Sequence, residues 1–385
     1  MNAKSAIKFA LNIFFVTTFV VFFVSIPLSC SSLEGMFVTI LSGNPKIVSF
    51  AVESDSSLSL VFSEEIELAE LKISDAKSAV ENEDDFFETS RSTVPILTVE
   101  YSDNAFDNNK NKDFSVIIEL ADKTSVGNEY VLSGIACDKS GNDLEFSLPF
   151  TGFNANPARL IFSEVRSKHT SKSGSVSKPE YIEFYVLKGG NTAGLEVITG
   201  SDGEDKRYIF PCIEVKTGEY VIVHYRFAAS GVSVDELGSD LALATSESTN
   251  ATARDLWVDN RENETRISDS DVIVLFDAGK NKIADAVLYS ASGKNDWYRA
   301  YQKELSERAF ASGVWLGGSS VSDAACSDKV TSIRTLSRLN VEEIVSAYSK
   351  SDDKESFVVT SRAAEWAVVT KGTPGSKNNT SIYIK

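Results

Sequence analysis

Short runs in which apolar and polar residues alternate are the feature that most constrains this chain. Three of them lie close together, at residues 158–165, 179–186 and 220–225. In the second run, residues 181–184 read Tyr-Ile-Glu-Phe, so successive side chains point to opposite faces. This alternation is typical of a half-buried antiparallel strand. The sequence therefore predicts a β sheet in this part of the chain.

The first part of the chain carries strand-like runs of the same kind. Turn residues separate them at the spacing expected of a β-sandwich. One turn, at residues 138–142, reads Asp-Lys-Ser-Gly-Asn, and Gly141 suits a position with positive φ. The predicted strands of this first sandwich are Ile47–Phe50, Leu58–Phe62, Ile96–Tyr101, Phe114–Leu120, Tyr130–Leu132 and Leu144–Leu148.

Two resemblances add to this interpretation. The runs LIFSEV and EYIEFYV, with the ending EWAVVTKGTPGSKN, resemble the lamin-tail domain as bacteria use it. The hairpin at residues 271–289, with Asp285 and Tyr289 in register, resembles the same family, which is an immunoglobulin-like (Ig-like) β-sandwich. Residues 58–74 and 130–157 resemble a bacterial Ig-like module of surface proteins. The resemblances imply two consecutive Ig-like β-sandwiches, the first a spacer or binding module without an active site.

The second sandwich is predicted to carry insertions, because the lamin-tail domain is usually about half as long. They lie at residues 226–268, 291–330 and 340–355. The first is polar and predicts a long loop. In the second, apolar residues recur every four positions after Asp296, which predicts a helix. In the third, Asn340 and Glu343 resemble a capping box and predict a short helix.

Aromatic residues in the insertions are the candidate ligand-binding residues. Loops carried by a rigid sandwich are where binding usually evolves. The alternative is that these aromatic side chains pack the insertions onto the sheets. The candidates are Trp257, Trp297, Tyr298, Tyr301 and Trp315.

The N-terminus reads as a secretory signal. Lys4 and Lys8 precede an apolar run at residues 9–24, and small residues follow it. The next cysteine, Cys30, resembles the lipid-modified residue of a bacterial lipobox. The resemblance implies an exported lipoprotein with a signal-peptide helix at residues 1–29. The alternative is an uncleaved anchor helix, for which the apolar run is barely long enough.

The charge balance argues against a nucleic-acid partner. The chain has 38 Lys and Arg against 55 Asp and Glu, a net charge of −17. Binding to phosphate backbones needs clustered basic residues, and the sequence contains no such cluster. The acidic surface favours solubility, and recruitment of a cationic partner is the functional alternative.

No motif of a catalytic, cofactor or metal site occurs in the sequence. Residues 107–113 place oxygen ligands at alternate positions, but Lys112 and Ile118 stand where a calcium-binding EF-hand needs Gly and Glu. The two histidines, His169 and His224, have no nucleophile elbow to support a catalytic triad. A catalytic carboxylate pair stays open, since sequence does not locate two acids at the required separation. We therefore predict no enzyme activity, cofactor or metal.

The cysteines leave one possible disulfide. Besides Cys30, Cys137 is alone in the first sandwich, while Cys212 and Cys326 share the second. An oxidising compartment would allow the last two to pair. Two free buried thiols are the alternative.

Together these features predict a mainly β lipoprotein of the bacterial cell envelope, lipid-anchored to the outer membrane and facing the periplasm or the surface. We expect a non-catalytic binding or structural role with an envelope protein or a glycan as partner. An adhesin for host matrix and an accessory module of an extracellular hydrolase system are the alternatives. The predicted segments are a signal peptide at 1–29, a tether at 30–44, and sandwiches at 45–155 and 156–385.

Overall fold

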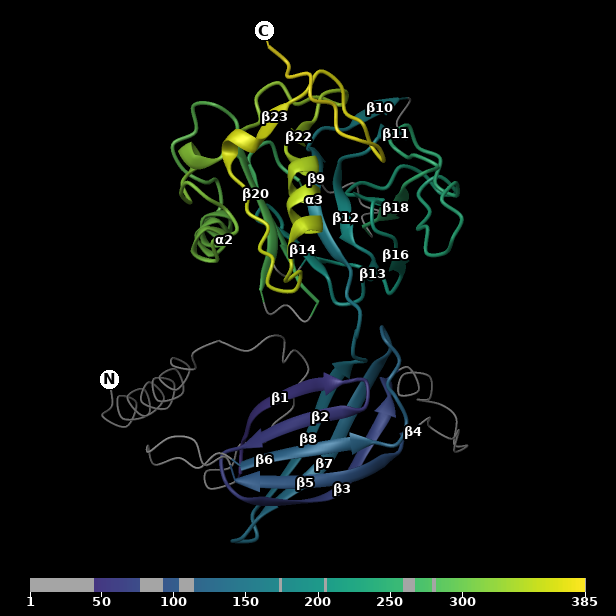
Figure 1. The fold of residues 1–385 in the computed structure, drawn as a ribbon, viewed down its shortest axis with the longest axis vertical. Helices are drawn as coiled ribbons and strands as arrows, with labels where there is room; N and C mark the ends of the chain where they lie inside the picture. The colour runs from purple at the N-terminus through teal and green to yellow at the C-terminus, as the bar shows by residue number, and fades with distance from the viewer. Residues whose placement is uncertain are drawn as a thin grey trace, which may run out of the picture. The chain divides into compact units, whose positions relative to one another are not determined.

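The computed structural model describes residues 45–76, 93–103, 114–172, 175–203, 206–258, 267–278 and 282–384. The predicted signal peptide, Cys30, the tether and the calcium-like loop at 107–113 lie outside these residues. No helix in the described ranges is long and apolar enough to cross a membrane. The fold is mainly β and contains two sandwiches, as the sequence predicts (Figure 1).

The first sandwich consists of two four-stranded antiparallel sheets. One has the order β1-β2-β6-β5 and the other the order β4-β3-β7-β8. The strands are β1 (Ile47–Ser54), β2 (Ser57–Phe62), β3 (Ile66–Asp75), β4 (Thr93–Val94), β5 (Ile96–Asp103), β6 (Phe114–Leu120), β7 (Glu129–Asp138) and β8 (Asp143–Thr151).

Alternation explains why the runs in this part form strands. In β6 and β8 every second side chain is buried in the core between the sheets. All six strands predicted here are confirmed. The prediction omitted β3, whose alternation is interrupted between Ala69 and Lys72, where Glu70 has a φ of 54°. Gly141 has a φ of 81°, as its turn predicted.

The second sandwich also consists of two sheets. The six-stranded sheet has the order β18-β17-β12-β9-β22-β23 and the five-stranded sheet the order β15-β14-β19-β20-β21. The first contains β9 (Arg159–Arg166), β12 (Tyr181–Lys188), β17 (Tyr220–His224), β18 (Arg254–Trp257), β22 (Leu336–Arg338) and β23 (Trp366–Val368). The second contains β14 (Glu196–Thr199), β15 (Tyr208–Ile209), β19 (Asp271–Phe276), β20 (Ile283–Ser290) and β21 (Ala325–Cys326). Two short pairs complete the strands: β10 (Thr170–Lys172) with β11 (Ser175–Lys178), and β13 (Gly190–Asn191) with β16 (Glu214–Val215).

The central strand β12 is antiparallel to its neighbours, as predicted, but it is buried on both faces. Its inner side chains Ile182 and Phe184 lie in the core between the sheets. On the outer face, Tyr181 packs against Ala253 of the first insertion. Leu187 packs against the helix of the third insertion. The prediction of a half-buried strand was therefore wrong, because the insertions cover the face that alternation assigns to solvent.

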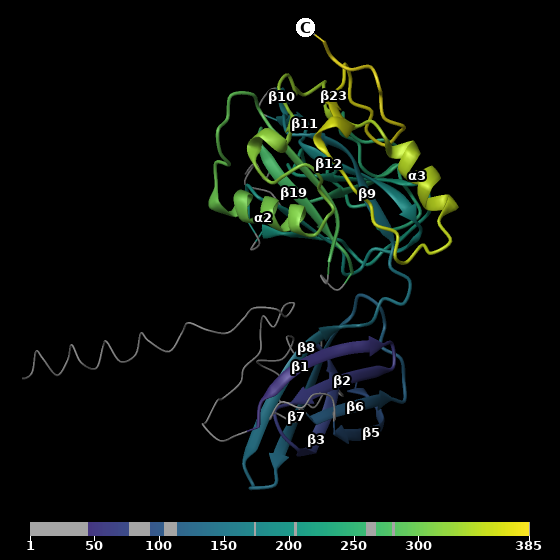
Figure 2. The ribbon, with the colours of Figure 1, turned by 60° about the vertical axis from the view of Figure 1, so that its left-hand side comes forward.

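The insertions contain both predicted helices. Helix α2 (Ala300–Ala311) lies against β19 and β20, and helix α3 (Val341–Lys350) lies against β12 (Figure 2). Helix α2 starts later than predicted, since Arg299 precedes it instead of Asp296. Helix α3 starts after Asn340 as predicted, but the Asn340 side chain caps no backbone N–H. The described part of the first insertion is mostly loop, but it includes β18, which runs parallel to β17. Short 3₁₀ turns lie at Val321–Asp323 and Ala363–Glu365.

Cys212 and Cys326 do not pair, so the possible disulfide between them is absent from the structure. Both are free and exposed thiols rather than buried ones. Cys212 lies shortly after β15 and Cys326 lies in β21, and these strands are the opposite edges of the five-stranded sheet. Four strand spacings of about 4.8 Å place these edges about 19 Å apart. A disulfide needs its two Cα atoms within about 7 Å.

Candidate functional site

A row of polar side chains crosses the outer face of the six-stranded sheet. Glu164 on β9 lies beside Glu183 on β12, and Tyr181 lies beside His224 on β17. Asp255 on β18 lies in the same row as Glu183, with Ile222 of β17 between them. Antiparallel and parallel register both place directly opposite residues on one face. All five residues are fully buried, so this face carries an internal polar network.

The two glutamates of this network are held by different donors. Glu164 accepts hydrogen bonds from the Tyr181 hydroxyl, from Ser337 Oγ at 2.9 Å and from the backbone N–H of Thr373 at 3.1 Å. Glu183 Oε2 accepts from the backbone N–H of Gly375 at 2.6 Å. Burial, and then the charge of Glu164, raise the pKa of Glu183 well above its ordinary value. We infer that Glu183 is protonated.

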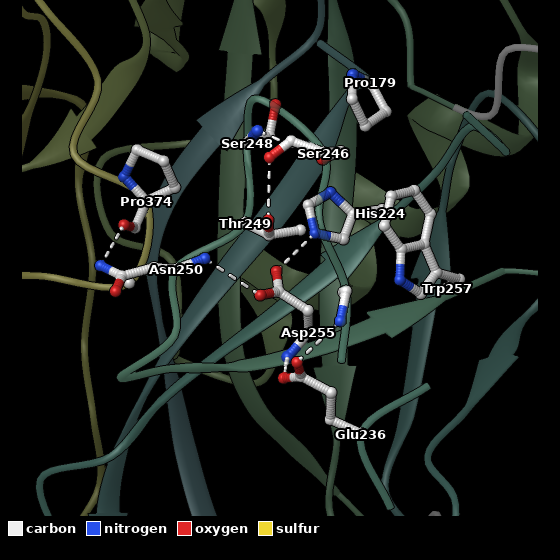
Figure 3. Close-up of polar contacts among 12 residues, drawn as sticks. Pro179, His224, Glu236, Ser246, Ser248, Thr249, Asn250, Asp255, Trp257 and Pro374 are labelled. Carbon is white, nitrogen blue, oxygen red and sulfur yellow. Dashed lines mark hydrogen bonds and ion pairs between the residues drawn. The ribbon is translucent and has the colours of Figure 1, made fainter. Parts of the chain in front are cut away.

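Figure 3 shows the other end of the row, where His224 meets Asp255. Nε2 of His224 donates to Asp255 Oδ1 at 2.6 Å, and its ring stacks on Trp257 with centroids 4.1 Å apart. Burial lowers the pKa of His224 despite the hydrogen bond to Asp255, so the ring is neutral. Asp255 Oδ2 also accepts from the backbone N–H of Asn250. The pair therefore anchors the first insertion to the sheet.

An open cavity of about 410 Å³ lies on the same outer face of the sheet. Its floor includes Tyr185 and Tyr220, which are directly opposite each other on β12 and β17. Their rings lie 5.3 Å apart at 78°. The residues that line the cavity are Tyr185, Tyr220, Arg338, Leu339, Val341, Glu342, Val345, Ser346, Lys377, Asn378 and Thr380.

Helix α3 forms one wall of the cavity and the C-terminal strap, residues 371–380, forms the other. The strap is tied to the sheet by Glu164 and Glu183, through the backbone of Thr373 and Gly375. Asn378 adds two bonds of 2.9 Å from its Nδ2, to the carbonyl oxygens of Ser163 and Arg338. The buried acids therefore hold this wall in place.

Three residues with charged side chains line the cavity. The Arg338 guanidinium is fully buried and donates to Asp285 Oδ2 at 2.7 Å, so its charge is already balanced. Lys377 on the strap and Glu342 on α3 form an ion pair across the open side, where their side chains are 68% and 70% exposed. Burial raises the pKa of Tyr220, which keeps its phenol neutral. The cavity thus combines a neutral, largely apolar interior with two opposite charges at its mouth.

Comparison with known proteins identifies a family for the second sandwich. Residues 158–368 match TP_1001_2nd, a family described as "protein second domain". The chain belongs to this family. An "Uncharacterized protein" of Treponema pallidum (strain Nichols) is 33% identical over 207 residues, which are 52% of this chain and 50% of that protein. The chain therefore spans about half the length of the curated relative it matches.

Two solved structures are similar over much of the chain, each at 12% identity. The N-terminal part of the bacterial S-layer protein SbsC matches with a TM-score of 0.23, over 64% of this chain and 43% of that one. A DUF4876 family protein from Bacteroides thetaiotaomicron matches with a TM-score of 0.27, over 72% of this chain and 83% of that one. Likenesses of this size carry no conclusion about function.

The aromatic residues proposed from the sequence lie elsewhere in the TP_1001_2nd domain. Trp297 and Trp315 are buried in the main hydrophobic core of the second sandwich, and Tyr301 packs against that core. Trp257 is buried against His224, whereas Tyr298 is 89% exposed. The structure does not bring the five together in one open site. It favours the alternative, in which aromatic side chains pack the insertions onto the sheets.

The residues of the cavity were missed by sequence reasoning. Tyr185 belongs to a predicted strand, and Val341 and Val345 belong to the apolar side of a predicted helix. Each of them therefore had a structural explanation. Lys377 lies in the strap, beyond the residues that match TP_1001_2nd. No local pattern signals that these elements meet.

Proposed function

We propose that this chain is a non-catalytic binding protein of the bacterial cell envelope, which binds a small ligand in the cavity beside α3. The cavity carries this proposal. Its volume of about 410 Å³ lies within the range of small-molecule sites, about 300–1,000 Å³. Aromatic and aliphatic side chains with a few polar groups at the edge are the usual lining of such sites.

The positions of the buried titratable groups support binding rather than catalysis. A general acid or base must come within hydrogen-bonding distance of its substrate. Glu164, Glu183, His224 and Asp255 are fully buried, and none of them lines the cavity. Each is engaged in holding the strap or the first insertion. We therefore propose that the four have positioning roles.

A cavity-filling variant tests the binding proposal. Ser346→Trp places an indole in the cavity, while Ala347→Trp adds the same group at the next, exposed position of α3. Thermal unfolding is measured with a panel of amino acids, peptides, glycans and envelope fragments. We expect compounds that stabilise the wild type and the Ala347 variant to leave the Ser346 variant unchanged. Equal stabilisation of both variants, or no stabilising compound, would contradict the proposal.

The location rests on the N-terminal sequence and on the resemblance to lamin-tail and Ig-like modules of exported proteins. We propose that Cys30 is the lipidated first residue of the mature chain, which anchors it in the envelope. Cys30→Ala should abolish incorporation of labelled palmitate in cells, with Cys137→Ala as the control. Unchanged labelling of the Cys30 variant would refute the lipid anchor without affecting the ligand proposal.

A further inference from the structure

The charges at the mouth of the cavity indicate which ligand class it fits, an inference that rests on the proposed binding function. Lys377 and Glu342 contact each other directly and come from opposite walls. Exposed ion pairs of this kind contribute little to stability, so a ligand can separate the two groups readily. The mouth therefore offers one cationic and one anionic partner, side by side.

The interior of the cavity suits an apolar group. Leu339, Val341 and Val345 supply aliphatic surface, and Tyr185 and Tyr220 supply two rings. The Arg338 guanidinium adds no free charge, because Asp285 balances it. A ligand group that enters beyond the mouth thus meets mainly carbon atoms and neutral hydroxyls.

The two opposite charges at the mouth of the cavity disfavour ligands that carry only one charge. A purely anionic ligand would bind Lys377 but meet the carboxylate of Glu342, and a purely cationic ligand would meet Lys377. A ligand that satisfies both must carry both charges. Because Lys377 and Glu342 touch, the two charges of the ligand must also be close together. An α-amino acid carries its ammonium and carboxylate on one carbon, whereas a longer peptide holds its ends apart.

We propose that the cavity binds the zwitterion of an α-amino acid with a large apolar side chain. The ligand carboxylate binds Lys377 Nζ and the ligand ammonium binds the carboxylate of Glu342. The apolar side chain lies between the tyrosine rings and the aliphatic residues of α3. The volume of about 410 Å³, at the small end of the range for ligand sites, agrees with a ligand of this size.

Calorimetric titration of the full-length chain in detergent tests the ligand class. The probes are L-phenylalanine, N-acetyl-L-phenylalanine without the ammonium, L-phenylalaninamide without the carboxylate, the dipeptide Phe-Leu, and cellobiose as a neutral sugar. Loss of one charge-assisted hydrogen bond should weaken binding about tenfold or more. We therefore expect L-phenylalanine to bind at least about tenfold more tightly than each of the other probes.

Two neutral substitutions assign the charges. Lys377→Gln should remove the preference for L-phenylalanine over its amide, and Glu342→Gln should remove its preference over the N-acetyl compound. Lys371→Gln on the strap and Glu343→Gln on α3 are matched controls, since both residues are exposed and neither lines the cavity. Both controls should keep wild-type selectivity.

The outcomes separate this inference from the proposed function. Cellobiose, N-acetyl-L-phenylalanine or L-phenylalaninamide could bind as tightly as L-phenylalanine, with that binding abolished by Ser346→Trp. In that case the proposal of a zwitterionic ligand is wrong, but the cavity is a binding site. Equal binding of Phe-Leu would overturn the argument from charge spacing. If no probe binds, the proposal of a zwitterionic ligand is also wrong. The proposed function fails only when the wider panel also shows no binding that depends on Ser346.

Discussion

Asp285→Asn tests whether one buried carboxylate joins the two sheets of the second sandwich. Asp285 lies on β20 of the five-stranded sheet and is fully buried. Its Oδ2 accepts hydrogen bonds from Arg338 Nη1 at 2.7 Å and from the backbone N–H of Phe162 at 2.8 Å, both in the six-stranded sheet. Asparagine preserves the size of the side chain but removes its charge. Arg338, also fully buried, would then lack its counter-charge.

The size of the effect follows from this burial. Removing one partner of a buried ion pair costs about 3–5 kcal/mol, because the other charge stays desolvated and uncompensated. For a domain of this size, about 1 kcal/mol shifts the midpoint of thermal unfolding by about 2–4 °C. We therefore expect Asp285→Asn to lower the Tm of the second sandwich by about 6–20 °C.

Tryptophan fluorescence measures this transition selectively, because all four tryptophans of the chain lie in the second sandwich. The control is Glu355→Gln, which breaks the exposed ion pair with Lys188 and should change the Tm by less than about 4 °C. The double variant Asp285→Leu with Arg338→Met should recover much of the loss, since it leaves no buried charge. The reasoning is refuted if Asp285→Asn unfolds at the control's temperature, or if the double variant is no more stable than Asp285→Asn.

Three further predictions address individual residues. Cys212 and Cys326 should react with a thiol reagent in the folded protein, and peptide mapping without reductant should show no link between them. Burial raises the pKa of Asp271 from 3.8 to about 6, so the folded state binds this proton more tightly than the unfolded state. This stabilisation is present below pH 3.8 and is lost as the pH rises through about 6. Between pH 3.5 and 7, the free energy of unfolding of the wild type, measured with denaturant, should fall by about 3 kcal/mol relative to that of Asp271→Asn. Gly375 has a φ of 72°, and a Cβ there would lie 2.6 Å from Cβ of Ala253. Gly375→Ala should therefore lower the free energy of unfolding by about 1–3 kcal/mol in the same assay.

Strands with uninterrupted alternation could be predicted from the sequence alone. The strand β6 has the predicted bounds Phe114–Leu120, and β2 differs from its prediction by one residue at its start, because each run specifies its own face and period. Where the backbone departs from that period, as at Glu70 in β3, the pattern fails to indicate a strand. Helix α3 was predicted from a capping-box-like start, but the Asn340 side chain makes no capping hydrogen bond. Local sequence thus predicts whether a segment is a strand or a helix better than it predicts where that segment begins and ends.

The cavity could not be predicted because its parts are remote in the sequence. Tyr185 comes from β12, Glu342 from α3 and Lys377 from the strap, and only the folded sheet brings them together. The tryptophans did not indicate the position of the site, for a different reason. An aromatic side chain in an insertion packs as readily into a core as onto a ligand, and Trp315 is fully buried.

The glutamates of the outer face explain why the strap lies where it does. Alternation along β9 and β12 assigns Glu164 and Glu183 to solvent, yet both are buried under the strap. A buried carboxylate without hydrogen-bond donors is strongly unfavourable. The backbone N–H groups of Thr373 and Gly375 supply donors, and protonation of Glu183 avoids a second negative charge beside Glu164. Since the strap also carries Lys377, the acids at the centre of the sheet set the position of one charge at the mouth of the cavity.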